Sequence, residues 1–241
     1  MQLAIDTSSD YAGLALAQDD KVIAELTWKA GPNHTTQLLP ALTSLLHLVK
    51  AEPSAFTSVA VAIGPGSYNG LRAGLSTAKG FAFALGIPIV GVGTLEVAAY
   101  QHHTGGLPIC ALHNAGREEI AAARYQWQDG KWCELQAPHL TTIALLSRTI
   151  DQPTVFCGEL SEDMGSQLKT HMGHLAIIPR SPTPRRPGSL ILLAWQRLSE
   201  GDSDDPATLQ PLYLREPAIT QPKPHPHLKG RKRAQEGKPS S

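Results

Sequence analysis

Few features of this sequence point to secretion, to a membrane or to a bound metal. It contains only three cysteines, Cys110, Cys133 and Cys157, an odd number whose spacing matches no metal-ligand motif. No apolar run approaches the length that crosses a bilayer, and the first residues show no basic stretch followed by an apolar core. We therefore expect a cytoplasmic protein with reduced, mostly buried thiols and no membrane association.

The chain also lacks net charge, but its charges are unevenly distributed. Residues 217–241 carry six Lys or Arg and one Glu, so this end is basic and residues 1–216 are mildly acidic. Residues 222–241 combine clustered charge with Pro and Gly and have almost no apolar side chains, a composition typical of disorder. Within them, Lys229–Arg233 is a cationic run that we interpret as part of a solvated tail. The alternative is a weak, salt-sensitive contact with RNA phosphates.

Motifs for nucleotide-dependent and metal-dependent catalysis are missing as well. The glycine-rich stretch 64–70 is followed by Leu71 and Arg72, where a Walker A loop has Lys and then Ser or Thr. Its glycine spacing also does not match G-x-G-x-x-G. The ten histidines include no His-Glu-x-x-His motif, and no Cys/His or Ser/His pair is placed by spacing. These absences argue against a peptidase, and we expect no catalytic residue, no metal ligand and no cofactor.

A strand-end acid, Asp6, is the remaining sign of nucleotide chemistry, because hydroxyl residues follow it. Actin-like ATPases hold metal and phosphate at such a place, but that architecture needs a second acid, and the matching turn His113-Asn114 has none. One carboxylate is a poor Mg²⁺ site, and the simpler role of Asp6 is to cap the turn from Thr7 to Asp10. A stand-alone ATPase or small-molecule kinase stays open as the alternative function. Its candidate phosphate-binding residues are Asp6, Thr7, Ser8, Gly64, Gly66 and Ser67.

Residues 59–95 are the most informative stretch, and they predict one strand–helix–strand unit. Residues 59–63 and 87–92 have the composition of buried strands. The helix between them begins near Ser67 or Asn69, both N-cap residue types, and ends at Gly86. A strand, a helix and a strand in so few residues predict a right-handed crossover in a parallel sheet.

The helix of this unit carries an unusual number of small residues. Each interior glycine costs roughly 1 kcal/mol relative to alanine, so a helix accepts one only where something approaches closely. Two interpretations stay open: tight packing on its own sheet, or contact with a helix of another subunit, and the two can use different faces. The residues concerned are Gly70, Ala73, Gly74, Thr77, Ala78 and Ala82.

The rest of the chain predicts an α/β protein with an internal duplication. Strands at 3–6, 11–17 and 22–28 precede a helix that Thr35 or Thr36 can cap, and after the central unit Thr94 can cap a further helix. This order, β-β-β-α-β-α-β-α, is the ribonuclease-H-like plan. A second, reduced copy follows Gly105-Gly106, with expected strands at 109–113, 119–126, 132–135 and 154–157 and expected helices at 141–149 and 189–199.

We accordingly predict two tandem ribonuclease-H-like subdomains, as in the actin-like ATPase fold. The first spans residues 1–104, the second spans 105–216, and the basic, Pro-rich, disordered tail spans 217–241.

Several segments together resemble one family. Leu3–Ser8, His34 with Leu38-Leu39-Pro40, and Gly64–Arg72 continuing through Gly91–Glu96 resemble the bacterial TsaB (YeaZ) proteins, and the resemblance returns at Pro211–Pro217. The loop departs mildly from the family pattern Gly-Pro-Gly-Ser-Phe-Thr-Gly at Tyr68 and Asn69. In addition, Asn114-Ala115-Gly116-Arg117 stands where many members have Asp-Ala-Arg. The resemblance implies the actin-like fold in two copies.

The resemblance also implies a non-catalytic scaffolding subunit of the complex that makes N6-threonylcarbamoyladenosine next to the tRNA anticodon. Members activate the transferase TsaD, act together with the ATPase TsaE, and form a homodimer when TsaD is absent. Contact with tRNA would be indirect or made by Lys229–Arg233. The helices at about 36–50 and 69–86 would form the partner interface. The expected interface residues are Leu38, Leu39, Leu42, Leu46, Gly70, Leu71, Ala73, Gly74, Thr77, Ala78 and Phe81.

Overall fold

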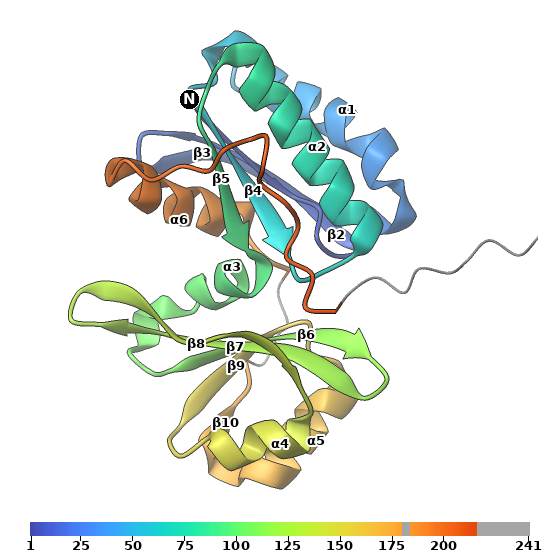
Figure 1. The fold of residues 1–241 in the computed structure, drawn as a ribbon, viewed down its shortest axis with the longest axis vertical. Coiled ribbons are helices and arrows are strands. Elements are labelled where there is room, and N and C mark those ends of the chain that lie inside the picture. The colour runs from blue at the N-terminus through green and yellow to red at the C-terminus, as the bar shows by residue number, and fades with distance from the viewer. Residues whose placement is uncertain (180–183, 216–241) are drawn as a thin grey trace, which may run out of the picture.

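The computed structural model describes residues 1–179 and 184–215, which form two lobes stacked along the long axis of the molecule (Figure 1). Each lobe is built on a five-stranded sheet, with strand order β3-β2-β1-β4-β5 in the first and β10-β9-β6-β7-β8 in the second. The two orders are equivalent, because a central strand pairs with an antiparallel hairpin on one side and with parallel strands on the other. No helix among the described residues is long and apolar enough to cross a membrane.

The first lobe contains the predicted opening hairpins and the central strand–helix–strand unit. Its strands are β1 (Gln2–Asp6), β2 (Tyr11–Gln18), β3 (Lys21–Lys29), β4 (Ser58–Gly64) and β5 (Ile89–Gly93). Its helices are α1 (His34–Leu48), α2 (Tyr68–Leu85) and α6 (Pro187–Ser199). Helix α2 begins after Ser67 and ends at Gly86, which has the left-handed φ of +64° that favours glycine. These bounds agree with the prediction for the central unit.

The two faces of the first sheet differ in side-chain size, and this difference decides which helices cover them. Successive side chains of a strand point to opposite faces. On β1, Leu3 and Ile5 point toward α1 and α2, whereas Ala4 points toward α6. Alanines of β2 and β4 continue that second face, so the backbone of α6 can pack close to the sheet.

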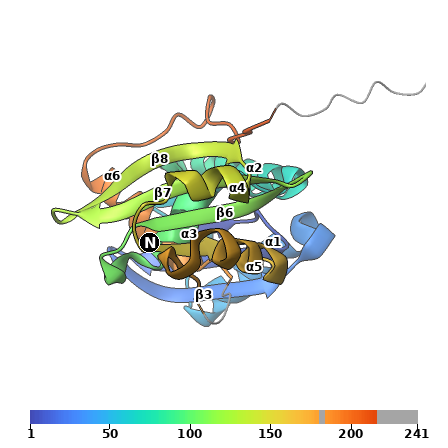
Figure 2. The same ribbon diagram turned by 90° about the horizontal axis from the view of Figure 1, so that it is seen from below.

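The second lobe repeats the plan with fewer helices. Its strands are β6 (Ile109–Gly116), β7 (Glu119–Gln128), β8 (Lys131–Thr141), β9 (Thr154–Gly158) and β10 (Ala176–Ile177). Helices α4 (Ile143–Leu146) and α5 (Glu162–Met172) cover its outer face (Figure 2). Helix α3 (Thr94–Tyr100) lies between the lobes and packs on the inner face through Leu95, Ala98 and Ala99.

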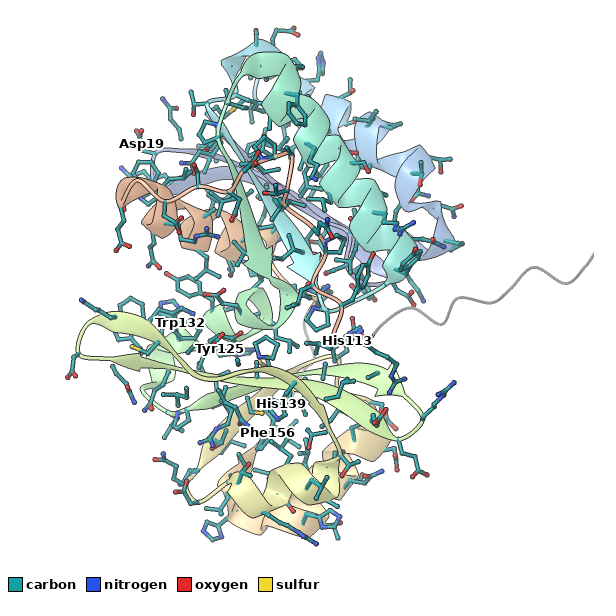
Figure 3. The ribbon with its side chains drawn as sticks, viewed as in Figure 1. Asp19, His113, Tyr125, Trp132, His139 and Phe156 are labelled. Carbon is teal, nitrogen blue, oxygen red and sulfur yellow. The ribbon has the colours of Figure 1, made fainter. Side chains whose placement is uncertain are left out.

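Aromatic residues fill the space between the lobes on the side of the β7–β8 hairpin. The rings of Tyr125 and Trp132 stack with centroids 5.6 Å apart, and Trp132 meets the ring of Tyr100 edge to face (Figure 3). On the opposite face of the same sheet, Phe156 packs toward α4 and α5. The central strands of this sheet are therefore covered on both faces, whereas the edge strand β8 has no fully buried residue.

Helix α6 and the segment after it return to the first lobe. The Asp204 amide donates to the Ile89 carbonyl oxygen (2.9 Å), and the Asp204 carboxylate accepts from the Gly91 amide (2.7 Å). Further along, the Leu212 amide donates to the Ile63 carbonyl oxygen (2.7 Å). This C-terminal segment, residues 200–215, covers the outer edge of β5. Residues 187–213 thus pack with the first sheet, whereas Leu214 and Arg215 contact the second lobe. The predicted second subdomain, residues 105–216, included all of these residues.

Several predicted details differ from the structure. Neither Thr35 nor Thr36 caps α1, because the helix continues from a 3₁₀ turn at Gly31–Asn33 and starts at His34. Thr94 does not cap α3, because its hydroxyl accepts a hydrogen bond from the Gly64 amide (3.0 Å) instead. Other 3₁₀ turns lie at Pro53–Ala55, His103–Gly105, Ser147–Thr149 and Gly173–Leu175. The predicted tail, residues 217–241, lies outside the described residues.

Candidate functional site

A cleft of about 850 Å³ lies between the lobes, where β1, β4 and β9 end. Ligands of open α/β sheets bind beyond the carboxyl ends of such strands. Ser9 and Ser67 line it from the first lobe, His113 and Glu159 from the second, and Arg185 from the connection that leads back to α6. The cleft is the place where the predicted nucleotide site would have to form.

The Asp6 carboxylate is buried next to Arg185, which lines this cleft, and is fully engaged by protein groups. Its Oδ1 accepts hydrogen bonds from the Ser8 amide (2.9 Å) and the Ser8 hydroxyl (2.5 Å), as a turn cap does. Its Oδ2 accepts from Nε of Arg185 at 2.9 Å. Burial alone raises the pKa of Asp6, but the charge and hydrogen bond of Arg185 together with the Ser8 bonds outweigh it and lower the pKa. Asp6 is therefore ionised and paired.

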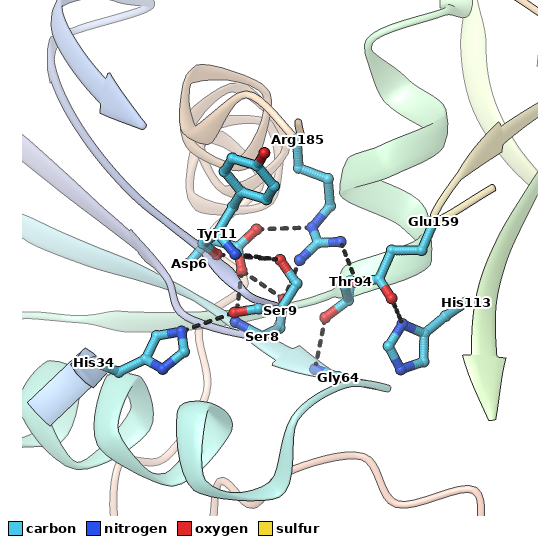
Figure 4. A network of polar contacts seen from close by, with 10 residues as sticks. All are labelled: Asp6, Ser8, Ser9, Tyr11, His34, Gly64, Thr94, His113, Glu159 and Arg185. Atoms are coloured by element: carbon cyan, nitrogen blue, oxygen red, sulfur yellow. Dashed lines mark hydrogen bonds and ion pairs between the residues drawn. The ribbon is translucent and has the colours of Figure 1, made fainter. Parts of the chain in front are cut away.

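Arg185 links this carboxylate to the second lobe (Figure 4). Its Nη2 donates to the Ser8 hydroxyl at 2.7 Å, and its Nη1 lies 3.6 Å from Oε1 of Glu159. Oε2 of Glu159 lies 2.8 Å from Nδ1 of His113. Burial raises the pKa of Glu159, but the neighbouring His113 and Arg185 outweigh it and lower that pKa. Carboxylates and basic side chains therefore alternate across the cleft, in the order Asp6, Arg185, Glu159 and His113.

The remaining residues predicted to bind phosphate are also engaged within the protein. Thr7 donates its hydroxyl to the Gly70 carbonyl oxygen (2.7 Å), and the Ser67 amide donates to the Ser8 carbonyl oxygen (2.8 Å). Gly66 lies so close to the backbone of Ser8 that a Cβ there would overlap it. The structure does bring these residues together, but it uses them to join α2 to the end of β1.

These contacts do not fit a nucleotide phosphate or a metal. The guanidinium of Arg185 is already shared by two carboxylates, and it is the only Lys or Arg among the described residues lining the cleft. Among residues 1–179 and 184–215, no group of three His, Cys, Asp or Glu could hold a metal ion. The described lining of the cleft therefore offers an anion no uncommitted Lys or Arg.

Sequence reasoning missed Glu159 and Arg185. It looked for a second acid at His113-Asn114, on the central strand of the second lobe. The acid of the second lobe is instead Glu159, which follows Gly158 at the end of the neighbouring strand β9. A strand that ends in glycine and then an acid was a usable signal, whereas nothing around Arg185 marked it.

A second candidate site is the outer face of α1 and α2. Of the predicted interface residues, only Leu39 is exposed, at 52%. Ala73, Thr77 and Phe81 are half-buried. The other seven are buried inside the first lobe, because the same leucine and glycine spacing that suggested an interface faces the sheet. They are Leu38, Leu42, Leu46, Gly70, Leu71, Gly74 and Ala78.

The two helices nevertheless present large apolar side chains to solvent. Phe83 is 63% exposed and Leu48 is 73% exposed, although neither was predicted at the interface. Both helices lack Asp and Glu, while Arg72 and Lys79 lie on α2. Gly80 has open space where a Cβ would stand, so a partner could approach the α2 backbone there. The face can bury apolar surface without desolvating a carboxylate of its own.

The sequence matches known proteins over most of its length. Residues 28–222 match the family model described as TsaD, tRNA N6-adenosine threonylcarbamoyltransferase. The tRNA threonylcarbamoyladenosine biosynthesis protein TsaB of Bacillus subtilis (strain 168) is 33% identical over 218 residues. That match covers 88% of this chain and 93% of the Bacillus protein.

Solved structures add support for the fold. YeaZ from Pseudomonas aeruginosa superposes with a TM-score of 0.73 at 22% identity, covering 88% of this chain and 99% of that one. An uncharacterized Pseudomonas aeruginosa protein with similarity to peptidase YeaZ reaches a TM-score of 0.77 at 22% identity, covering 89% and 99%. The sequence match over most of both chains goes further than shared architecture. The chain belongs to the TsaB (YeaZ) family.

Proposed function

We propose that this chain is a non-catalytic scaffolding subunit in tRNA threonylcarbamoyladenosine biosynthesis, and that it binds a TsaD subunit through the outer face of α1 and α2. The observation that carries the proposal is the pair of exposed side chains Leu39 and Phe83, on two adjacent helices that contain no carboxylate. Exposed apolar patches on soluble proteins mark interaction sites.

The interlobe cleft supports a scaffolding role over a catalytic one. A stand-alone ATPase or kinase would need a carboxylate free to hold metal, but Asp6 is bound by Arg185 and Ser8. A peptidase would need a metal cluster or an activated nucleophile, and the described residues offer no metal cluster. Catalysis in the complex is accordingly assigned to TsaD.

We further propose that the ATPase TsaE is a third component of the complex. When TsaD is absent, the chain forms a homodimer through the same outer face of α1 and α2. Contact with tRNA is indirect or is made by Lys229–Arg233, which lies outside the described residues.

Calorimetric titration of the purified chain with TsaD from the same source tests the interface. We expect Phe83→Asp and Leu39→Asp each to weaken binding at least about tenfold, because a charge would be buried against the partner. Leu145→Asp is the matched control, since Leu145 is 53% exposed and lies on α4 of the second lobe.

Circular dichroism spectra first establish that all three variants fold. Unchanged affinity in both α1/α2 variants would remove this face from the interface. A loss of affinity only in Leu145→Asp would move the interface to the second lobe.

A further inference from the structure

The two lobes are joined on opposite sides of α3 by unlike contacts. On the side of the β7–β8 hairpin, Tyr100, Trp127 and Trp132 pack together and reach the apolar cluster of the first lobe. On the side of the cleft, the side chains that meet are ionic and lie around Arg185. The aromatic side is held by packing, so whether the cleft opens depends on the ionic side.

Charge alone would push the cleft open if Arg185 were absent. Asp6 belongs to the first lobe and Glu159 to the second, and both carboxylates face the same guanidinium. Without that cation, two like charges would face each other across the cleft, and Coulomb interactions are weakly screened on its buried side, at Asp6. The side chains of Asp6 and Arg185 are only 5% and 8% exposed. The guanidinium converts a repulsion between the lobes into an attraction.

Arg185 is also placed so that it can act on both lobes at once. It lies on the connection that carries the chain from the second lobe back to α6, two residues before the helix starts. Its Nε is bound to Asp6 and its Nη1 faces Glu159, so different edges of one planar group reach the two lobes. Its neighbour Arg186 is different, because it pairs with Glu25, and both of those residues pack within the first lobe.

We propose that Arg185 is a built-in cation that holds the lobes closed by binding Asp6 of the first lobe and Glu159 of the second. These ion pairs then keep the cleft closed, so that the two lobes do not move relative to each other and the molecule behaves as one rigid body. Within the described parts of the chain, 1–179 and 184–215, one other ion pair, Arg215 with Glu119, reaches between the lobes, but its arginine is 43% exposed whereas Arg185 is 8% exposed, and exposed pairs contribute little. This inference concerns the isolated chain and does not rest on the proposed binding of TsaD.

The decisive variant is Glu159→Gln. It removes the carboxylate of the second lobe but leaves Asp6 paired with Arg185, so no buried charge is left alone. Glu159 is 35% exposed, which makes the substitution tolerable for folding. Glu162→Gln is the matched control, because Glu162 is an exposed carboxylate three residues away in the same lobe. Arg185→Met removes the cation itself, and Arg186→Met is its control.

The distance between the lobes is the readout. Spin labels are attached to cysteines that replace the exposed residues Ser44 on α1 and Thr170 on α5, in a chain carrying Cys133→Ser. Pulsed electron spin resonance then measures the distribution of distances, with excess unlabelled protein added to suppress signals between molecules.

We expect a single narrow distribution for the parent chain, Glu162→Gln and Arg186→Met. Glu159→Gln and Arg185→Met should give a broader distribution shifted to longer distances. If Glu159→Gln keeps the distance distribution of the parent chain, the proposal that Arg185 holds the lobes closed is refuted. If Arg185→Met does not fold, Glu159→Gln alone tests the proposal, because the buried pair of Asp6 and Arg185 is intact in that variant.

Discussion

The Thr7 hydroxyl donates a 2.7 Å hydrogen bond to the Gly70 carbonyl oxygen, so the turn after β1 is fastened directly to the backbone of α2. The same hydroxyl fills the space above Gly74, where a Cβ would overlap it. A Cβ on Gly70 would overlap the Thr7 carbonyl oxygen. Both glycines are therefore required for packing α2 on its own sheet, which is the first of the two interpretations given for this small-residue helix.

Gly74→Ala should destabilise the protein by about 1–3 kcal/mol, the usual cost of overpacking a tight contact. Gly80→Ala is the control on the same helix, because a Cβ there meets nothing within 4 Å. We expect it to stabilise by about 0.5–1 kcal/mol through a lower entropy of the unfolded chain. Urea denaturation measures both. Equal effects of the two substitutions would contradict the assignment of Gly74 to internal packing.

Asp6→Asn should cost about 3–5 kcal/mol at neutral pH, because it breaks a buried ion pair with Arg185. The pKa of Asp6 is lower in the folded than in the unfolded protein, so its contribution to stability is complete above about pH 4 and fades as the pH falls. Denaturation of the parent and the variant from pH 7 to pH 3 tests this. The difference in unfolding free energy should shrink toward the acid end, and a constant difference would argue against an ionised Asp6.

The three cysteines should differ in reactivity. Burial raises the pKa of the Cys110 thiol to about 12 and also raises that of Cys157, so neither forms the reactive thiolate at neutral pH. Cys133 is half-buried on β8 and accessible. Titration with a thiol reagent should find one reactive group per native chain and three after unfolding. Rapid reaction of a second thiol in the native protein would show that the interior of the second lobe opens.

The C-terminal segment should be needed for a stable first lobe. A chain ending after residue 200 loses the bonds of Asp204 and Leu212 to Ile89, Gly91 and Ile63, each worth about 1 kcal/mol. We expect a lower Tm and aggregation through the uncovered edge of β5. A chain ending after Arg215 should keep the stability of the full-length chain. Thermal scans at two protein concentrations compare the three lengths.

The first lobe was predictable because its signals are local. Strand alternation, the N-cap Ser67 and the left-handed Gly86 each act within a few residues, and the prediction placed α2 to within two residues. Helix α5 was missed because it has only three buried apolar residues, Met164, Leu168 and Met172, among polar ones. Helix α6 was placed to within two residues, but its return to the first sheet depends on an alanine face that lies on other strands.

The candidate sites were harder to predict for a different physical reason. Asp6 and Arg185 are 179 residues apart, so no local pattern pairs them. On α1, Leu38 and Leu39 are neighbours in the chain and lie about 100° apart around the helix axis, and only the packed structure shows that Leu38 is buried and Leu39 exposed. A helix that packs on its own sheet and on a partner uses the same residue types for both, so composition alone cannot separate the two faces.

Asp6 and His113 occupy corresponding places in the two lobes, since each follows an Ala and an aliphatic residue in the central strand, β1 or β6. Both contribute to one cluster, where Asp6 meets the base Arg185 and His113 meets the acid Glu159. The first lobe thus has an acidic residue with a basic partner at this position, and the second lobe has a basic residue with an acidic partner. In diverging sequences of this architecture, Asp6, Arg185 and Glu159 should covary, because loss of Arg185 leaves two carboxylates unpaired and loss of Asp6 leaves the buried guanidinium without its 2.9 Å partner.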